Sequence, residues 1–88
     1  MPAEDRQRID RWLWHARLVR TRGDAAALAD AGYVRVNGAR IAAPSRQVRP
    51  GDVITVAIDR RVRVLKVRGF VERRGPAATA QALYEDLT

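Results

Sequence analysis

The chain has 88 residues and a formal net charge of +7 at pH 7, a length that fits one small domain with a single thin core. The absence of cysteine excludes a disulfide framework and a thiolate metal site. No apolar run approaches the roughly 20 residues needed to span a bilayer, and the polar, acidic residues 1–5 are not typical of a secretory signal. We therefore expect a cytoplasmic location.

Positive charge is concentrated in the first half of the chain. Residues 6–49 hold ten arginines and three aspartates, a net charge of +7, whereas residues 50–88 carry +2 and residues 1–5 carry −2. Of the 17 basic residues, all are arginine except Lys66. Arginine grips phosphate with a planar fork and stacks on bases, although a GC-rich genome also favours it over lysine. This concentration of charge on one compact unit favours nucleic-acid binding.

A first helix is predicted from Asp10 onward. Asp10 precedes an apolar run and suits an N-cap, and in that register Ile9 and Trp14 would form a hydrophobic staple. The pattern predicts that this helix ends near Val19 or Arg20. The residues that recur at helical spacing and would face the core are Ile9, Trp12, Leu13 and Ala16.

A second helix is predicted to start directly after Thr21. The sequence from Thr21 to Asp24 has a capping-box pattern, in which Thr21 caps the helix and Asp24 places a carboxylate at its positive end. Gly32 supplies a left-handed stop. The predicted inward-facing residues are Ala25, Leu28 and Ala29. The short break between the helices predicts a compact pair that resembles a helix-turn-helix.

The chain then changes to a strand pattern. Val34 and Val36 alternate with polar neighbours and lead into Asn37-Gly38, the strongest short hairpin signal, because both turn positions tolerate positive φ. A short return strand is expected around residues 40–41, and a further turn at residues 50–52. The sequence therefore predicts a β-hairpin directly after the second helix.

Two longer strands and a final helix are predicted in the remainder of the chain. Residues 53–58 alternate between two faces, and residues 62–71 form a second run interrupted by basic residues. The order of elements predicts an α+β fold, in which a two-helix basic unit packs on a small, mostly antiparallel sheet with a C-terminal strand and helix extension. We expect one domain, with a core at residues 8–58 and the extension at residues 59–88. The residues spaced for a short amphipathic C-terminal helix are Ala80, Leu83, Tyr84 and Leu87.

Several short motifs of this chain resemble those of one known family. They are Arg8-Ile9-Asp10, Leu13, Thr21-Arg22, Gly32 through Gly38, Ser45 with Val48, and Gly51-Asp52. Their order and spacing resemble the RNA-binding domain named after ribosomal small-subunit protein four, also called the αL motif. The resemblance covers about residues 8–58 and implies an RNA-binding function.

Two further features resemble a small, ribosome-associated bacterial branch of this family. They are Trp12-Leu13-Trp14 and the Arg73–Ala77 segment with its tail at residues 82–85. This narrower resemblance implies binding to ribosomal RNA on free large ribosomal subunits that carry a stalled nascent chain on tRNA. It also implies a role in recycling those subunits under stress, with tRNA as a possible second partner.

The candidate RNA-binding residues come from both predicted helices, the hairpin and the loop after it. They are Arg8, Arg11, Arg17, Arg20, Thr21, Arg22, Arg35, Asn37, Arg40, Ser45 and Arg46. If the fold is as expected, their side chains line one concave basic surface, which suits the wide, shallow minor groove of an RNA helix or a bulged junction. A solvated arginine face without a ligand is the alternative, and Arg17 could instead pair with Asp10 or Asp30.

Catalysis and metal binding are not indicated by these residues. Ser45 has no base partner in the sequence, and Asp10 and Asp24 are better explained as helix caps. His15 is the single histidine, so we expect it to contact RNA or solvent rather than a metal. We therefore expect no enzyme activity and no cofactor.

Two other classes of function remain open from the sequence. A DNA-binding helix-turn-helix would need Arg, Asn or Gln at exposed positions of its second helix, whereas Asp24 and Asp30 face outward there. A basic module that docks on an acidic protein is the other alternative. We expect a monomer, with DNA and membranes as unfavoured partners.

Overall fold

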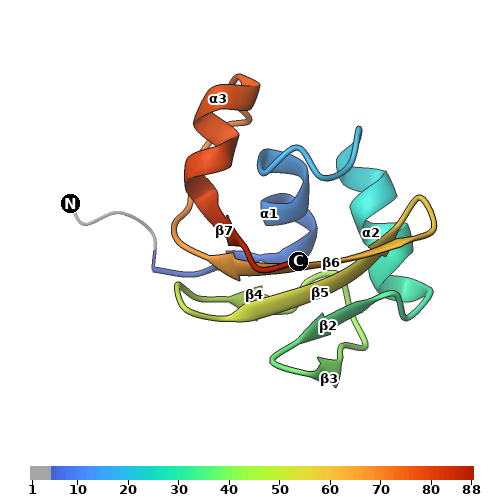
Figure 1. The fold of residues 1–88 in the computed structure, drawn as a ribbon. Coiled ribbons are helices and arrows are strands. Elements are labelled where there is room, and N and C mark those ends of the chain that lie inside the picture. Colours follow the sequence, from blue (N-terminus) through green and yellow to red (C-terminus); the bar gives the residue numbers. More distant parts are fainter. Residues whose placement is uncertain (1–4) are drawn as a thin grey trace.

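The computed structural model describes residues 5–88 as helices packed on one side of a twisted antiparallel sheet (Figure 1). The sheet has five strands in the order β3-β2-β5-β6-β7, and a separate two-stranded sheet pairs β1 with β4. This is the α+β arrangement predicted from the sequence. The helices are α1 (Ile9–His15), α2 (Arg22–Asp30) and α3 (Ala77–Ala80), and the strands are β1 (Gln7–Arg8), β2 (Val34–Val36), β3 (Ala39–Arg40), β4 (Gln47–Val48), β5 (Val53–Ile58), β6 (Arg61–Val67) and β7 (Tyr84–Asp86).

The core lies between the two long helices and the sheet. Trp12 and Leu13 of α1 are fully buried against Ile54, Val56 and Leu65 of the central strands. Fully burying such side chains contributes roughly 1.5–3 kcal/mol each. The predicted inward-facing stripe of α1 is confirmed, as are the inward positions of Ala25 and Ala29 in α2. No helix among residues 5–88 is long and apolar enough to cross a membrane.

Helix α1 begins earlier than predicted, so the N-cap assignment of Asp10 is wrong. The N–H of Ile9 donates to the Arg46 carbonyl at 2.8 Å, and the N–H of Asp10 donates to the Pro44 carbonyl at 3.3 Å. The loop after β3 therefore satisfies donors that a capping side chain would otherwise satisfy. Asp10 lies in the first turn of the helix and is buried.

Helix α1 also ends at His15, four residues before the predicted limit near Val19. The N–H of Arg17 donates to the Trp14 carbonyl, and the N–H of Leu18 donates to the Leu13 carbonyl, at 3.1 Å each. This is a Schellman ending, with Arg17 in the left-handed position at φ 60°. Glycine usually marks that position, and arginine gives no such signal.

The second helix and the hairpin follow the prediction. Thr21 Oγ1 accepts from the Asp24 N–H at 3.0 Å, and Gly32 has a φ of 85° at the end of α2. Asn37 and Gly38 both have positive φ, 52° and 83°, as a two-residue hairpin turn requires. Strand β5 has the predicted bounds, residues 53–58.

The C-terminal helix is shorter than predicted, and the chain ends in a strand. After α3, a 3-10 turn covers Gln81–Leu83, and Tyr84 begins β7 instead of continuing the helix. Strand β7 pairs antiparallel with β6, whose backbone groups would otherwise lack partners along that edge. Hydrogen bonds from Thr88, and then from Arg63, hold the pKa of Asp86 below its ordinary value.

Candidate nucleic-acid interface

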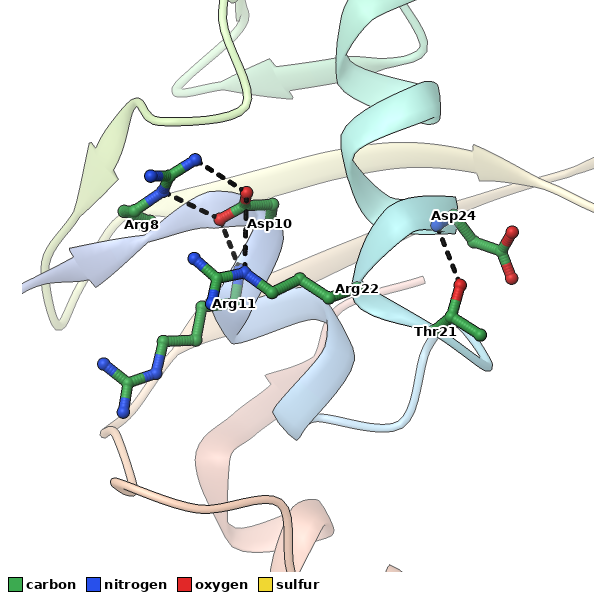
Figure 2. A network of polar contacts seen from close by, with 6 residues as sticks. All are labelled: Arg8, Asp10, Arg11, Thr21, Arg22 and Asp24. Carbon is green, nitrogen blue, oxygen red and sulfur yellow. Dashed lines mark hydrogen bonds and ion pairs between the residues drawn. The ribbon is translucent and has the colours of Figure 1, made fainter.

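A buried carboxylate organises the start of α1 (Figure 2). The Asp10 side chain is 4% exposed and accepts two hydrogen bonds from Arg8, at 3.2 Å from Nε and 3.0 Å from Nη2. The main-chain N–H of Arg11 donates to the same carboxylate at 2.7 Å, and Arg22 Nε lies 3.7 Å from Oδ2. We call Arg8, Asp10 and Arg22 the Asp10 cluster. It holds guanidinium groups from β1 and α2 next to each other.

The two arginines of the Asp10 cluster keep much of their surface exposed. The side chains of Arg8 and Arg22 are 46% and 43% exposed, although the carboxylate between them is buried. A guanidinium has five N–H donors, and Asp10 engages two of Arg8 and lies near Nε of Arg22. The remaining donors can bind an anion such as phosphate in the paired geometry typical of arginine. Because Asp10 already orders both side chains, binding an anion costs less conformational entropy than it would for two freely moving arginines.

The loop before β4 lies beside this cluster. Its backbone contacts the start of α1 through the carbonyls of Pro44 and Arg46, and Ser45 and Arg46 are exposed. We call Arg8, Arg22, Ser45 and Arg46 the arginine surface. These four of the predicted site residues lie around the start of α1, Arg8 and Arg22 through their side chains and Ser45 and Arg46 through the backbone of their loop.

Arg11 and Arg17 instead bind the segment that follows β6. Arg11 Nη2 donates to the Glu72 carbonyl at 2.6 Å, and Arg17 Nε donates to the Gly75 carbonyl at 2.8 Å. Within residues 5–88, Arg17 thus bonds to this carbonyl and not to Asp10 or Asp30, the two alternatives left open by the sequence. Both arginines help to hold the C-terminal segment against α1.

Arg74 is a structural residue that sequence reasoning missed. Its Nε donates to the Trp14 carbonyl at 3.0 Å, its Nη2 lies 3.5 Å from the Val19 carbonyl, and its guanidinium lies 5.8 Å from the centre of the Trp14 ring. A cation at this end of α1 also complements the helix dipole. The neighbouring Arg73 is exposed, and nothing in the sequence distinguishes the two residues.

The hairpin arginines do not join the arginine surface, so the single concave surface expected from the sequence is not formed. Arg35 is exposed between the buried Val34 and Val36, which face the helices, and it therefore lies on the opposite face of the sheet. Arg40 pairs across from Arg35, and its guanidinium lies against Gly32 at the end of α2. Their positions leave the two hairpin arginines separate from Arg8 and Arg22.

The remaining predicted site residues have local structural roles or lie elsewhere. Asn37 donates to Asp52 at 3.1 Å and accepts from the Val53 N–H at 2.9 Å, so its amide fastens the hairpin turn to β5. Thr21 caps α2, and Arg20 lines a groove between α2 and the β5–β6 turn. His15 is 1% exposed, so the expectation that it contacts RNA or solvent is wrong. Among residues 5–88, no three His, Cys, Asp or Glu side chains gather as metal ligands.

Comparison with known proteins assigns this chain to a family. The S4 domain family matches residues 7–54. A structure described as the trimeric heat shock protein 15 of Vibrio cholerae has a TM-score of 0.86 and 34% sequence identity, and the match covers 92% of this chain and 81% of that chain. The chain belongs to the S4 domain family, in its heat shock protein 15 branch. The resemblance stated from the sequence motifs, to an RNA-binding domain family, is confirmed.

The sequences of curated relatives support this family assignment. Heat shock protein 15 of Escherichia coli K12 is 37% identical over 79 residues, which are 90% of this chain and 59% of that protein. The Aeromonas salmonicida homologue is 42% identical over 82 residues. The chain thus spans about three fifths of the length of these relatives, 59% in both cases. The small ribosomal subunit protein uS4 of Macrococcus caseolyticus is 43% identical over 49 residues, or 56% of this chain and 24% of that protein.

Proposed function

We propose that this S4 domain protein binds structured ribosomal RNA in the cytoplasm, on free large ribosomal subunits that carry a stalled nascent chain on tRNA. Binding there would help to recycle these subunits under stress. Membership of the S4 family supports RNA binding, and the heat shock protein 15 relatives support a role in stress. The structural observation that carries the proposal is the Asp10 cluster, which presents two half-exposed guanidinium groups from different elements.

The arrangement and the family together favour RNA over the other classes of partner. A backbone phosphate can receive several N–H donors from Arg8 and Arg22 at once, because Asp10 keeps their guanidinium groups close. Contacts of this kind read the shape and phosphate path of a folded RNA rather than its sequence. The net charge of +7 adds a long-range attraction to any polyanion.

A DNA-binding helix-turn-helix is less well supported. The exposed positions of α2 include Asp24, Ala27 and Asp30. Carboxylates and alanines at these positions cannot make the paired donor contacts with guanine or adenine that a recognition helix uses. An acidic protein would be attracted by the same charge and could pair its carboxylates with the same donors, so membership of the S4 family, rather than this geometry, favours RNA over it.

A three-way competition experiment tests the proposal. A labelled folded ribosomal RNA fragment is bound to the protein and then displaced by unlabelled structured RNA, duplex DNA of equal charge, or an acidic protein. We expect the structured RNA to compete at least about tenfold better than the DNA, because directed contacts add to the shared electrostatic attraction. Co-sedimentation with purified free large subunits then tests the ribosomal part. Equal competition by all three would contradict RNA recognition.

Oligomeric state is a separate part of the proposal. We expect a monomer, whereas the Vibrio cholerae relative is described as trimeric. Light scattering of the protein over a range of concentrations distinguishes a mass near 9.9 kDa from three times that value. A stable trimer at micromolar concentration would contradict the monomer.

A further inference from the structure

A groove of about 770 Å³ lies on the side of α2 away from the Asp10 cluster. One wall is formed by α2, and the other by the end of β5 and the turn that leads into β6. Figure 1 shows where α2 and this turn lie in the fold. Asp24, Ala27 and Ala31 line the α2 wall, and they fall on one face at helical spacing. Arg22 points from the opposite side of the same helix at that spacing. The volume is within the range of pockets that hold small ligands.

The groove combines an apolar floor with charged groups at its rim. Leu28 and Ile58 are partly buried in its floor, and Tyr33 stands at its edge with 57% of its surface exposed. Arg20 and Arg60 add two positive charges, and the carboxylates of Asp24 and Asp59 add two hydrogen-bond acceptors. An aromatic ring, guanidinium groups and carboxylate acceptors together match the parts of a nucleotide: a flat base, a phosphate and the N–H donors on the base edge.

The turn that carries Arg60 has an unusual backbone. Asp59 and Arg60 have φ values of 51° and 64°, and the residues that flank them, Ile58 and Arg61, are paired across the hairpin. A two-residue turn of this type normally contains asparagine and glycine, because other residues resist positive φ. Strained positions of this kind are concentrated at functional sites. Here the strained turn places an arginine at the mouth of the groove.

The groove lies across the start of α2 from the Asp10 cluster. Arg20 lines the groove, and Arg22, two residues further on, belongs to the Asp10 cluster. The positive end of α2, capped by Thr21, lies between these two arginines. An RNA backbone that crosses this helix end meets Arg22 on one side and Arg20 on the other.

We propose that the groove holds one unpaired nucleotide of the bound RNA. The base lies against Tyr33 above the apolar floor, the phosphate lies near Arg20 and Arg60, and Asp24 or Asp59 accepts N–H groups of the base edge. This inference rests on the proposed RNA-binding function and adds a specific ligand class to it. It explains why an aromatic side chain is left exposed beside two arginines.

Two RNA hairpins that differ by one unpaired adenosine test this inference. The affinity of the full chain for each hairpin is measured at one salt concentration. We expect the hairpin with the unpaired adenosine to bind about tenfold more tightly, which is within the range for stacking of one base on an aromatic side chain. The Tyr33→Ala variant should lose this preference and keep its affinity for the fully paired hairpin. The Tyr33→Phe variant retains the ring and should retain the preference.

Val62→Ala provides the matched control. Val62 is 58% exposed in β6 and pairs across from Ala57, but it does not itself line the groove. Its substitution therefore removes exposed apolar surface near the groove without removing an aromatic ring. The control should bind both hairpins like the parent protein. Thermal unfolding of each variant confirms that the fold is kept, as the exposure of Tyr33 leads us to expect.

The outcomes separate the groove from RNA binding in general. If the parent protein binds both hairpins equally, or if Tyr33→Ala keeps the preference, the groove proposal is wrong and RNA binding stands. A self-association that Tyr33→Ala abolishes would overturn it too, because the groove would then be an interface between copies of the chain. If neither hairpin nor any other structured RNA is bound, the proposed function fails and the groove proposal fails with it.

Discussion

Asp10 is the acidic residue on which the presentation of two arginines depends. Its carboxylate is almost fully buried, yet both arginines that it contacts are nearly half exposed. A carboxylate in such a position lowers the net charge of the surface while fixing its geometry. These two effects have opposite consequences for RNA affinity, so they can be separated by substitution.

Replacing Asp10 with asparagine should weaken RNA binding although it raises the net charge by one. The loss should be about fivefold or more, because ordering a long side chain on binding costs roughly 0.5–1.5 kcal/mol and two such side chains are released. Asp30→Asn is the matched control, since it makes the same charge change at an exposed position of α2. Titration of a structured RNA measures both variants. If Asp10→Asn binds more tightly, as Asp30→Asn should, Asp10 has no positioning role.

Three glycines allow a graded test of backbone conformation. A side-chain Cβ at Gly38 or Gly69 would meet no atom within 4 Å, but Gly38 has a φ of 83°. Gly32 has a φ of 85°, and a Cβ at this position would also overlap the Arg40 guanidinium. The free energy of unfolding should therefore fall little for Gly69→Ala and by about 1–2 kcal/mol for both Gly38→Ala and Gly32→Ala, because the exposed Arg40 guanidinium can move away from the new Cβ. Urea unfolding measures the order, and equal losses at all three positions would contradict this account.

At the level of elements, the local signals predicted α2, the Asn37-Gly38 turn and β5 well. Each has a strong signal of its own: a capping threonine, a glycine at positive φ, or strict alternation. The errors occurred where tertiary contacts decide. The end of α1 depends on an arginine in the left-handed region, and β7 depends on the free edge of β6 rather than on its own sequence pattern.

The candidate site could be predicted only in part, because tertiary contacts decide which of its residues meet. The sequence placed Arg8 and Arg22 next to the starts of the two helices, and in the structure their side chains meet at Asp10. The sequence could not show which face Arg35 occupies relative to the helices, or that Arg11 and Arg17 bond to the main chain of the C-terminal segment. Those facts depend on the packing of segments far apart in the chain.

The contact between α1 and the C-terminal segment should depend on Arg74 and not on Arg73. Removing the Arg74 side chain deletes its hydrogen bond to Trp14, its long contact with Val19 and its contact with the Trp14 ring. We expect Arg74→Ala to lose about 2 kcal/mol of stability, and Arg73→Ala less than about 0.5 kcal/mol. Both variants lose one positive charge, so a difference between their unfolding free energies in urea reports the contacts of Arg74 and not its charge. Similar losses in the two would mean that Arg74 does not fasten the segment to α1.

At the level of the whole molecule, the affinity for RNA should depend steeply on salt. If about six phosphates are neutralised, the logarithm of the affinity should fall with the logarithm of salt concentration with a slope of about −4 to −5. Binding isotherms of a structured RNA between 50 and 300 mM salt, roughly the range where release of counterions dominates, give this slope. A nearly flat dependence would contradict an electrostatic interface.

The most direct test of the central claim compares two charge-matched double variants in their affinity for purified free large ribosomal subunits. Arg22→Ala with Arg46→Ala removes half of the arginine surface and leaves Arg8 to pair with Asp10. Arg61→Ala with Arg73→Ala removes the same charge from exposed positions on β6 and after it. We expect both to remain folded and the first to lose at least about tenfold more affinity, because directed phosphate contacts are lost together with charge. Equal losses in the two folded variants would contradict the assignment of the interface to the arginine surface.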